Sequence, residues 1–184
     1  PQISMTDSKK LTLNLEGSPE EWVEKFRNLR NPRDIATLLD VDYELLVYYL
    51  YKIPYENRYR VFQIKKRRSS SSTRTISAPA KSLKIIQHKL AQVLASVYEP
   101  KAPVHGFRKG KSILTNAERH VNQKYVLNVD LSNFFPSINF GRVRGMFMAV
   151  PYKLDEKVAT VLAQICCFNN ELPQGAPTSP IVSN

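Results

Sequence analysis

Cysteine is scarce in this sequence: the 184 residues contain two, Cys166 and Cys167, and they are adjacent. Adjacent cysteines do not form an ordinary structural disulfide, so a disulfide-stabilised secreted scaffold is excluded and a reducing, cytoplasmic setting is expected. Long apolar runs are also missing. The longest nearly uncharged stretches, such as residues 158–168, fall far short of the roughly 20 residues that span a bilayer. We therefore expect no membrane segment, and no secretory signal is recognisable.

Acidic residues are few relative to basic ones, 16 against 27, which gives a formal net charge of +11. The excess is local, because residues 56–111 carry fourteen basic and two acidic side chains while the remainder is close to neutral. Such a local concentration of positive charge favours a polyanionic partner, since each phosphate that is neutralised releases counterions. A basic face that only solubilises the protein is the alternative. Apolar residues make up 42%, enough for a core, so a disordered chain is excluded.

The first part of the sequence, residues 1–55, predicts a helical leader. A hydroxyl, a proline and two acids in Ser18-Pro19-Glu20-Glu21 are typical of a helix start. Two further short helices are expected, over residues 35–39 and 42–52. Residues 32–39 are interpreted either as a small helical recognition unit or as part of an appendage that packs on the main domain.

The rest of the sequence mixes strand and helix patterns, which predicts an α+β fold. Residues 59–64 alternate and are rich in β-formers, so we expect a strand, a basic and serine-rich hairpin loop over 65–73, and a returning strand over 74–79. Apolar residues at helical spacing predict an amphipathic helix over 82–98. The remaining expected elements are a helix over 112–121, an apolar strand over 125–131, a break over 134–137, and helices over 142–149 and 155–167.

Asp130 is an acid at the end of the apolar stretch 125–131. Burying a carboxylate there is costly unless a cation or hydrogen-bond donors compensate it. Asp130 is therefore interpreted either as a cap of the following turn or as a ligand of a divalent metal. Phe134 and Phe135, directly after it, are either core residues or a wall of a ligand pocket.

Two further segments carry polar groups that suit a nucleotide. The loop over residues 172–180 contains three prolines, Gly175 and Gln174, and it either reads a sugar or base edge or only connects two elements. The hairpin carries Lys65, Lys66, Arg67 and Arg68, with Arg74 across from them. A guanidinium can hold a triphosphate by two parallel hydrogen bonds, whereas each of the lysines alone is better interpreted as a solvated charge.

Several motifs in this order resemble those of reverse transcriptases. Residues 130–138, Asp-Leu-Ser-Asn-Phe-Phe-Pro-Ser-Ile, are similar to the metal-binding strand of that family. Residues 172–180 are similar to the second palm motif, and residues 74–76, 83–87 and 105–107 to fingers motifs. The stretch Asn116-Ala117-Glu118-Arg119-His120 matches the Asn-Ala-x-x-His signature of retron reverse transcriptases. The resemblance extends from about residue 59 to the last residue.

This resemblance implies a right-hand polymerase: a helical leader (1–55), fingers (56–123) and the first part of a palm (124–184). It implies that Asp130 holds Mg²⁺ as a catalytic carboxylate and that the backbone after it, at Leu131, helps hold the nucleotide phosphates. Phe135 would exclude a ribose 2′-OH, and Gln174 would contact the nucleotide sugar.

The resemblance also implies the partners. Arg74, with Lys65 or Lys66, would hold the triphosphate of a dNTP, and a primer hydroxyl would attack the α-phosphate in line with the help of two metal ions. In retrons the template is a structured noncoding RNA that also supplies the priming 2′-OH. RNA contacts are expected from Lys65 to Arg68, and from Asn116 and His120, although His120 is equally interpreted as structural. A bacterial cytoplasmic enzyme of phage defence, with a possible effector protein as partner, is implied as well.

The sequence departs from the family in one respect. The family places two more catalytic acids in a Tyr-x-Asp-Asp hairpin after the second palm motif, whereas the acids after Asp130 are Asp155, Glu156 and Glu171. One acid does not build a two-metal site. We therefore expect a fragment cut inside its fold that does not polymerise DNA alone. A polymerase-like RNA-binding module without catalysis and a reverse transcriptase of the group II intron type are the alternatives.

Overall fold

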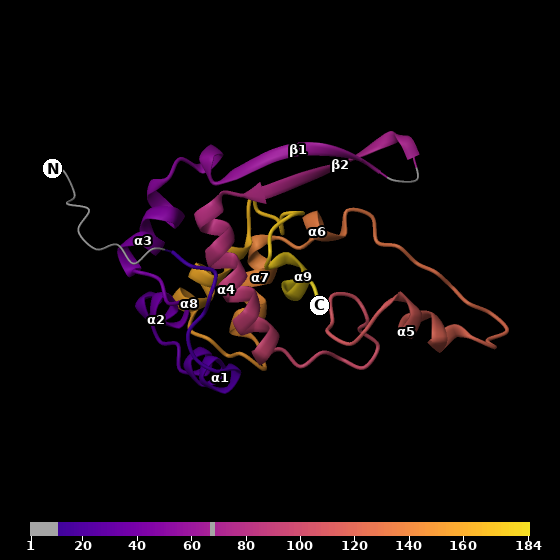
Figure 1. Cartoon of the computed structure of the whole chain (residues 1–184), viewed down its shortest axis with the longest axis horizontal. Coiled ribbons are helices and arrows are strands. Elements are labelled where there is room, and N and C mark those ends of the chain that lie inside the picture. Colours follow the sequence, from indigo (N-terminus) through magenta and orange to yellow (C-terminus); the bar gives the residue numbers. More distant parts are fainter. Residues whose placement is uncertain (1–10, 67–68) are drawn as a thin grey trace.

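The computed structural model describes residues 11–66 and 69–184, which form a helical body with a two-stranded hairpin at its edge (Figure 1). The fold is thus of mixed helix and strand type. The longer elements are α1 (Pro19–Arg27), α2 (Pro32–Leu38), β1 (Tyr59–Lys66), β2 (Ser69–Pro79), α4 (Lys81–Val97), α7 (Phe140–Met148) and α8 (Glu156–Cys166). The shorter ones are α3 (Tyr43–Val47), a π-helix (Tyr48–Lys52), α5 (Ile113–Ala117), α6 (Phe134–Ser137), α9 (Ser179–Val182) and the 3₁₀ turns Tyr55–Asn57 and Glu118–His120. No described helix is long and apolar enough to cross a membrane.

Helix α4 lies at the centre of the body (Figure 1). Its apolar positions recur every three or four residues and are buried, as the sequence pattern predicted. They belong to one continuous cluster with buried side chains of α1, α2, α7 and α8. Helices α1 and α2 therefore share a core with the rest of the chain.

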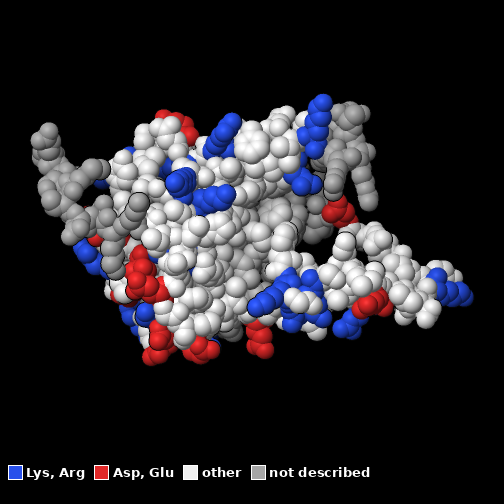
Figure 2. Space-filling view, in the orientation of Figure 1, with Lys and Arg blue, Asp and Glu red and all other residues white. Residues whose placement is uncertain are grey.

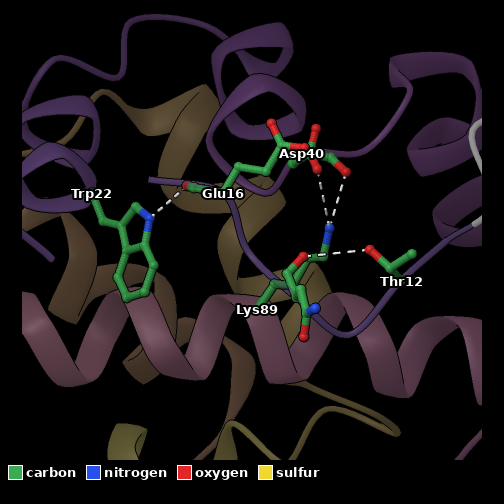
Figure 3. Close-up of polar contacts among 6 residues, drawn as sticks. Thr12, Glu16, Trp22, Asp40 and Lys89 are labelled. Atoms are coloured by element: carbon green, nitrogen blue, oxygen red, sulfur yellow. Dashed lines mark hydrogen bonds and ion pairs between the residues drawn. The ribbon is translucent and has the colours of Figure 1, made fainter. Parts of the chain in front are cut away.

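A part-buried ion pair joins the N-terminal helices to α4. Lys89 of α4 is 1% exposed, and its Nζ donates to the backbone carbonyl of Asp40 at 3.0 Å and lies 3.8 Å from a carboxylate oxygen of the same residue (Figure 3). The same close-up shows the indole of Trp22 donating to the Glu16 carbonyl. Lys89 is one of the fourteen basic residues counted over residues 56–111. Because its side chain is buried, it does not contribute to the positively charged surface.

Helix starts follow the capping signals. Ser18 forms a capping box with Glu21 at the start of α1, and Asn31 forms one with Asp34 at the start of α2. Asp155 caps α8, as predicted. Helix α7 begins at Phe140, two residues earlier than expected, because Asn139 accepts a hydrogen bond from the Arg142 backbone.

The hairpin is longer than predicted. Strand β1 continues to Lys66 and β2 already begins at Ser69, so part of the expected loop over residues 65–73 belongs to the strands, with Lys65 paired to Thr73 and Lys66 to Ser69. The strands are antiparallel, with Ile64 opposite Arg74 and an irregularity between Lys65 and Lys66. The basic and serine-rich composition that indicated a loop therefore did not prevent both strands from extending into it.

The prediction of a strand over residues 125–131 is wrong for this structure. The segment is extended but forms no ladder, and Tyr125, Leu127 and Val129 are 83%, 87% and 75% exposed. A strand is stable only when a neighbour accepts its backbone hydrogen bonds, and none of the described residues pairs with this segment. In Figure 1 it runs from the end that carries α5 back to α6.

Three shorter predictions need correction. The helix expected over 42–52 changes to a π-helix at Tyr48, and the helix expected over 112–121 is α5 followed by a 3₁₀ turn. The break expected over 134–137 is one turn of helix, α6. Proline at the third position of α6 is compatible with this turn, since the first N–H groups of a helix have no intrahelical partner.

Candidate active site

A pocket of about 830 Å³ lies where the hairpin, the Asp130 segment and the proline-rich loop meet. It gathers Arg74, Asp130, Leu131, Phe135 and Gln174, which the sequence assigned to one nucleotide site although they are spread over a hundred residues. The other lining residues are Thr73, Thr75, Ser77, Ser132, Asn133, Phe134, Pro136 and Glu171.

Arg74 reaches the pocket from β2, and its position in the paired part of the hairpin determines where its side chain starts. Lys65 is exposed and lies one register position farther out, opposite Thr73, without lining the pocket. Lys66 is described only by its backbone, at the end of β1. Arg67 and Arg68 lie outside the described residues.

Asp130 lies in the exposed extended segment before α6. Helix α6 begins after Asn133, which adopts a left-handed conformation (φ 50°), and it has no side-chain cap. The interpretation of Asp130 as the cap of this turn is therefore not supported. Asp130 lies instead on the wall of the pocket.

The donor set for a metal is incomplete in the described part of the chain. No group of three or more His, Cys, Asp or Glu side chains there is close enough to hold a metal ion. The pocket wall carries two acids, Asp130 and Glu171. These residues do not by themselves fit a two-metal centre, which needs more carboxylate ligands.

Phe134 and Phe135 both line the pocket, and their rings meet edge to face at 5.7 Å. They differ in burial. Phe134 is 37% exposed, whereas Phe135 is half-buried and also packs against the core. Phe135 is thus held in place by the core while presenting one side to the pocket, so both interpretations of this aromatic pair apply to it.

The proline-rich loop is tied to both walls of the pocket by backbone hydrogen bonds. The Leu172 N–H donates to the carbonyl of Ile138, the last residue of the Asp130 motif, at 3.0 Å. The Ser77 N–H of β2 donates to the carbonyl of Gln174 at 2.8 Å. The loop therefore does more than connect two elements, because it joins the hairpin to the Asp130 segment.

Glu171 is a pocket residue that the sequence analysis did not assign. Partial burial raises the pKa of its carboxyl group. Its backbone bridges to both Asn139 and Phe168. No sequence signal marked it, since it lies one residue before the recognised motif.

A second, smaller pocket of about 420 Å³ contains Asn116 and His120, the two ends of the Asn-Ala-x-x-His signature. Ala102, Pro103, His105 and Arg119 complete its lining. The ring of His105 bonds to the Thr115 hydroxyl at 2.9 Å. Desolvation, followed by the nearby charges of Lys111 and Arg119, lowers the pKa of His105. This pocket shares no lining residue with the Arg74 pocket, so Asn116 and His120 lie on a separate surface.

Basic side chains lie along the hairpin and around the α5 end, while acidic ones gather over the N-terminal helices (Figure 2). The pocket with Arg74 opens beside the basic hairpin. This distribution agrees with the charge segregation in the sequence and suits a phosphate-bearing ligand.

Comparison with known proteins agrees with this site. The reverse transcriptase (RNA-dependent DNA polymerase) family matches residues 64–184. The chain belongs to this family. The match includes Arg74, Asp130, Phe135 and Gln174, so the whole pocket lies inside the family domain.

Two individual relatives indicate which kind of reverse transcriptase the chain resembles. The chain is 33% identical over 156 residues to the retron Ec86 reverse transcriptase of Escherichia coli, which covers 85% of this chain and 48% of the relative. It is 34% identical over 175 residues to the retron Mx65 reverse transcriptase of Myxococcus xanthus, covering 84% and 40%. The resemblance to retron reverse transcriptases is confirmed. This reverse transcriptase chain spans less than half the length of these relatives.

Proposed function

We propose that the full-length protein is an RNA-directed DNA polymerase of the retron type. The observation that carries this proposal is the single pocket that holds Arg74, Asp130, Phe135 and Gln174 inside the family domain. In this proposal residues 1–55 are a helical leader, 56–123 the fingers and 124–184 the first part of the palm of a right-hand polymerase.

Each pocket residue then has a role toward an incoming dNTP. The Arg74 guanidinium holds the triphosphate by charge-assisted hydrogen bonds, and the backbone at Leu131 contacts its phosphates. Gln174 contacts the sugar, and the Phe135 ring fills the space that a ribose 2′-OH would need. Lys65 and Lys66 add positive charge farther out along the hairpin. Together these contacts hold the nucleotide in one orientation, which is the main protein contribution to phosphoryl transfer.

Mg²⁺ is the proposed cofactor, and Asp130 is the residue of this chain that would bind it. The Asp130 carboxylate would hold such an ion, and the chemistry that it would supply there is positive charge against the phosphates. The described residues do not complete its coordination, so this chain alone is proposed to be inactive.

The proposed template is a structured noncoding RNA, which is copied into cDNA from dNTPs. The printed names of the relatives, retron reverse transcriptases, support this class of substrate. Lys65 to Arg68 are proposed as non-specific RNA contacts, and Asn116 and His120 as contacts at the second pocket. A role in bacterial phage defence, in the cytoplasm and with an effector protein, is the corresponding cellular proposal.

The test is primer extension by the full-length protein carrying Asp130→Asn. The neutral amide does not balance a divalent ion, so we expect extension to fall by at least about 10³-fold, which corresponds to several kcal/mol of transition-state stabilisation. Asp155→Asn is the matched control, because Asp155 caps α8 and does not line the pocket. Unchanged extension by Asp130→Asn contradicts the assignment. A wild-type protein that binds RNA but never extends a primer supports the non-catalytic alternative.

A further inference from the structure

The loop over residues 171–175 acts as a spacer between the two walls of the pocket. The Gln174 carbonyl accepts a hydrogen bond from the Ser77 N–H of β2 at 2.8 Å. Two residues earlier in the loop, the Leu172 N–H donates to the Ile138 carbonyl at 3.0 Å. The buried Ser179 hydroxyl donates to the Pro173 carbonyl between them at 2.7 Å, which fixes the middle of the loop. Any change in how the loop lies on β2 therefore changes the separation between the walls.

Gly175 is the point at which the loop lies closest to β2. A Cβ built at Gly175 would be 2.9 Å from Cγ2 of Ile76 and 3.1 Å from the Ser77 carbonyl oxygen. Ordinary carbon contacts are longer than this, so any larger residue would push the loop and the strand apart. Gly175 also has a φ of 121°, which L-residues rarely adopt.

Displacing β2 at Ile76 would move Arg74 as well. The two residues are two positions apart on one strand, and their side chains therefore lie on the same face of the hairpin. The outer backbone edge of β2 at Ser77 is held by the loop, and β1 pairs with the other edge. The loop contact at residues 76–77 thus supports, from outside the hairpin, the strand that carries Arg74.

We propose that Gly175 is a positioning residue of the nucleotide pocket: its missing side chain lets loop 171–175 lie directly on β2 and so sets Arg74 at the correct distance from Gln174, Phe135 and Asp130. This inference rests on the proposed polymerase function. It assigns to Gly175 no contact with the nucleotide. Its effect is transmitted through Ile76 and Ser77 to Arg74.

The experiment measures single-nucleotide incorporation by the full-length protein, with kcat and KM for the dNTP determined separately. Gly175→Ala is expected to raise KM and to lower kcat/KM by about 10²-fold, the usual loss for a misplacement of about 1 Å. Gly110→Ala is the matched control, because Gly110 also has a positive φ (75°) but no atom within 4 Å of a built Cβ. Its kcat/KM should stay within about threefold of wild type, since it disturbs no packed neighbour.

Introducing Gly175→Ala into the Arg74→Ala variant separates a positioning effect from a general structural effect. If Gly175 acts through Arg74, adding Gly175→Ala to Arg74→Ala should raise KM little further, whereas independent defects would multiply. If Gly175→Ala does not yield folded protein, Ile76→Phe makes the same contact too large while leaving the Gly175 backbone unchanged, and the same rise in KM is expected.

The outcomes distinguish the inference from the function on which it rests. A wild-type full-length protein that incorporates no dNTP overturns the proposed function and this role with it. A wild-type protein that is active while Gly175→Ala, or Ile76→Phe in its place, leaves KM unchanged overturns the positioning role alone. Equal losses in Gly175→Ala and Gly110→Ala also overturn it, because the contact with β2 would then be irrelevant.

Discussion

Phe135 shows how one residue can belong to the core and to the pocket at once. It packs against the buried cluster and lines the pocket together with Phe134. A ring held by the core cannot easily move away when a larger sugar enters. Of the two adjacent aromatic rings, the structure therefore favours Phe135 as the rigid wall.

Phe135→Ala in the full-length enzyme is expected to reduce discrimination against ribonucleotides by about tenfold to hundredfold, the range for adding or removing a small group in a packed pocket. The smaller side chain leaves space for the 2′-OH. Incorporation kinetics with paired ribo- and deoxynucleotides measure this. Phe134→Ala is the control, since Phe134 lines the same pocket without packing against the core. A loss of discrimination in Phe134→Ala alone would place the gate at the other ring.

At the scale of elements, α2 is a seven-residue helix that depends on its N-terminus. The Asn31 side chain accepts from the Arg33 and Asp34 backbones, and the Asp34 carboxylate accepts from Arg30 at 2.7 Å and from Asn31 at 3.0 Å. The hydrogen bond from the Arg30 backbone, followed by those from Asn31, lowers the pKa of Asp34 despite some desolvation. Such a short helix is marginal alone, so its cap and its packing must both contribute.

Two substitutions in this cap should differ in their dependence on pH. Asn31→Ala is expected to cost about 1 kcal/mol of unfolding free energy at pH 7 and to keep most of that cost at low pH, because the hydrogen bonds that Asn31 accepts from the Arg33 and Asp34 backbones do not titrate. Only the hydrogen bond that its side-chain amide donates to the Asp34 carboxylate, at 3.0 Å, weakens when that carboxylate is protonated. Asp34→Asn should destabilise the protein at pH 7. Because the folded-state pKa of Asp34 is lowered, its contribution is complete above the unfolded value of 3.8 and is lost as the pH falls through the folded value.

Urea unfolding of wild type and both variants, from pH 7 down to pH 3, measures this difference. The gap between wild type and Asp34→Asn should narrow below the unfolded pKa, while most of the gap for Asn31→Ala should remain. A constant gap for Asp34→Asn would contradict the role of its charge in the cap.

At the scale of the whole molecule, charge is segregated between a basic hairpin and α5 end and a more acidic leader (Figure 2). Lys89 does not contribute to this surface, because it is buried against Asp40. The exposed lysines and arginines of residues 56–111 are therefore the proposed source of attraction for RNA. Contacts with phosphates position a nucleic acid but carry no sequence information.

The 184-residue chain is accordingly expected to bind RNA weakly and without sequence preference. Its affinity should fall with salt, with a log–log slope of roughly −0.7 per phosphate engaged on a single strand. Replacing Lys65, Lys66, Arg67 and Arg68 together with Ala should make this slope shallower, while Lys65→Ala alone should hardly change it. Fluorescence anisotropy with a cognate and a scrambled RNA at several salt concentrations is the measurement. Tight, salt-insensitive binding of the cognate RNA would instead indicate specific recognition within this chain.

Features that depend on residues close to one another in the sequence could be predicted without a structure. The caps at Ser18 and Asp155, the buried stripe of α4 and the existence of the hairpin follow from local hydrogen bonding and from periodicity. The family could be predicted as well, because the residue types and the order of its motifs are recognisable in the sequence alone. The same local reasoning was wrong for residues 125–131, because β-forming residues make a strand only when another strand pairs with them.

Only the tertiary structure decided which distant groups meet. The Lys89–Asp40 pair, the place of Glu171 in the pocket and the contact of Gly175 with Ile76 and Ser77 join residues that lie 49 or more positions apart or in different elements. A sequence pattern records what a residue needs, such as a carboxylate that requires a cation or a glycine that requires space. It does not record which partner supplies it, because that depends on how the chain folds back on itself.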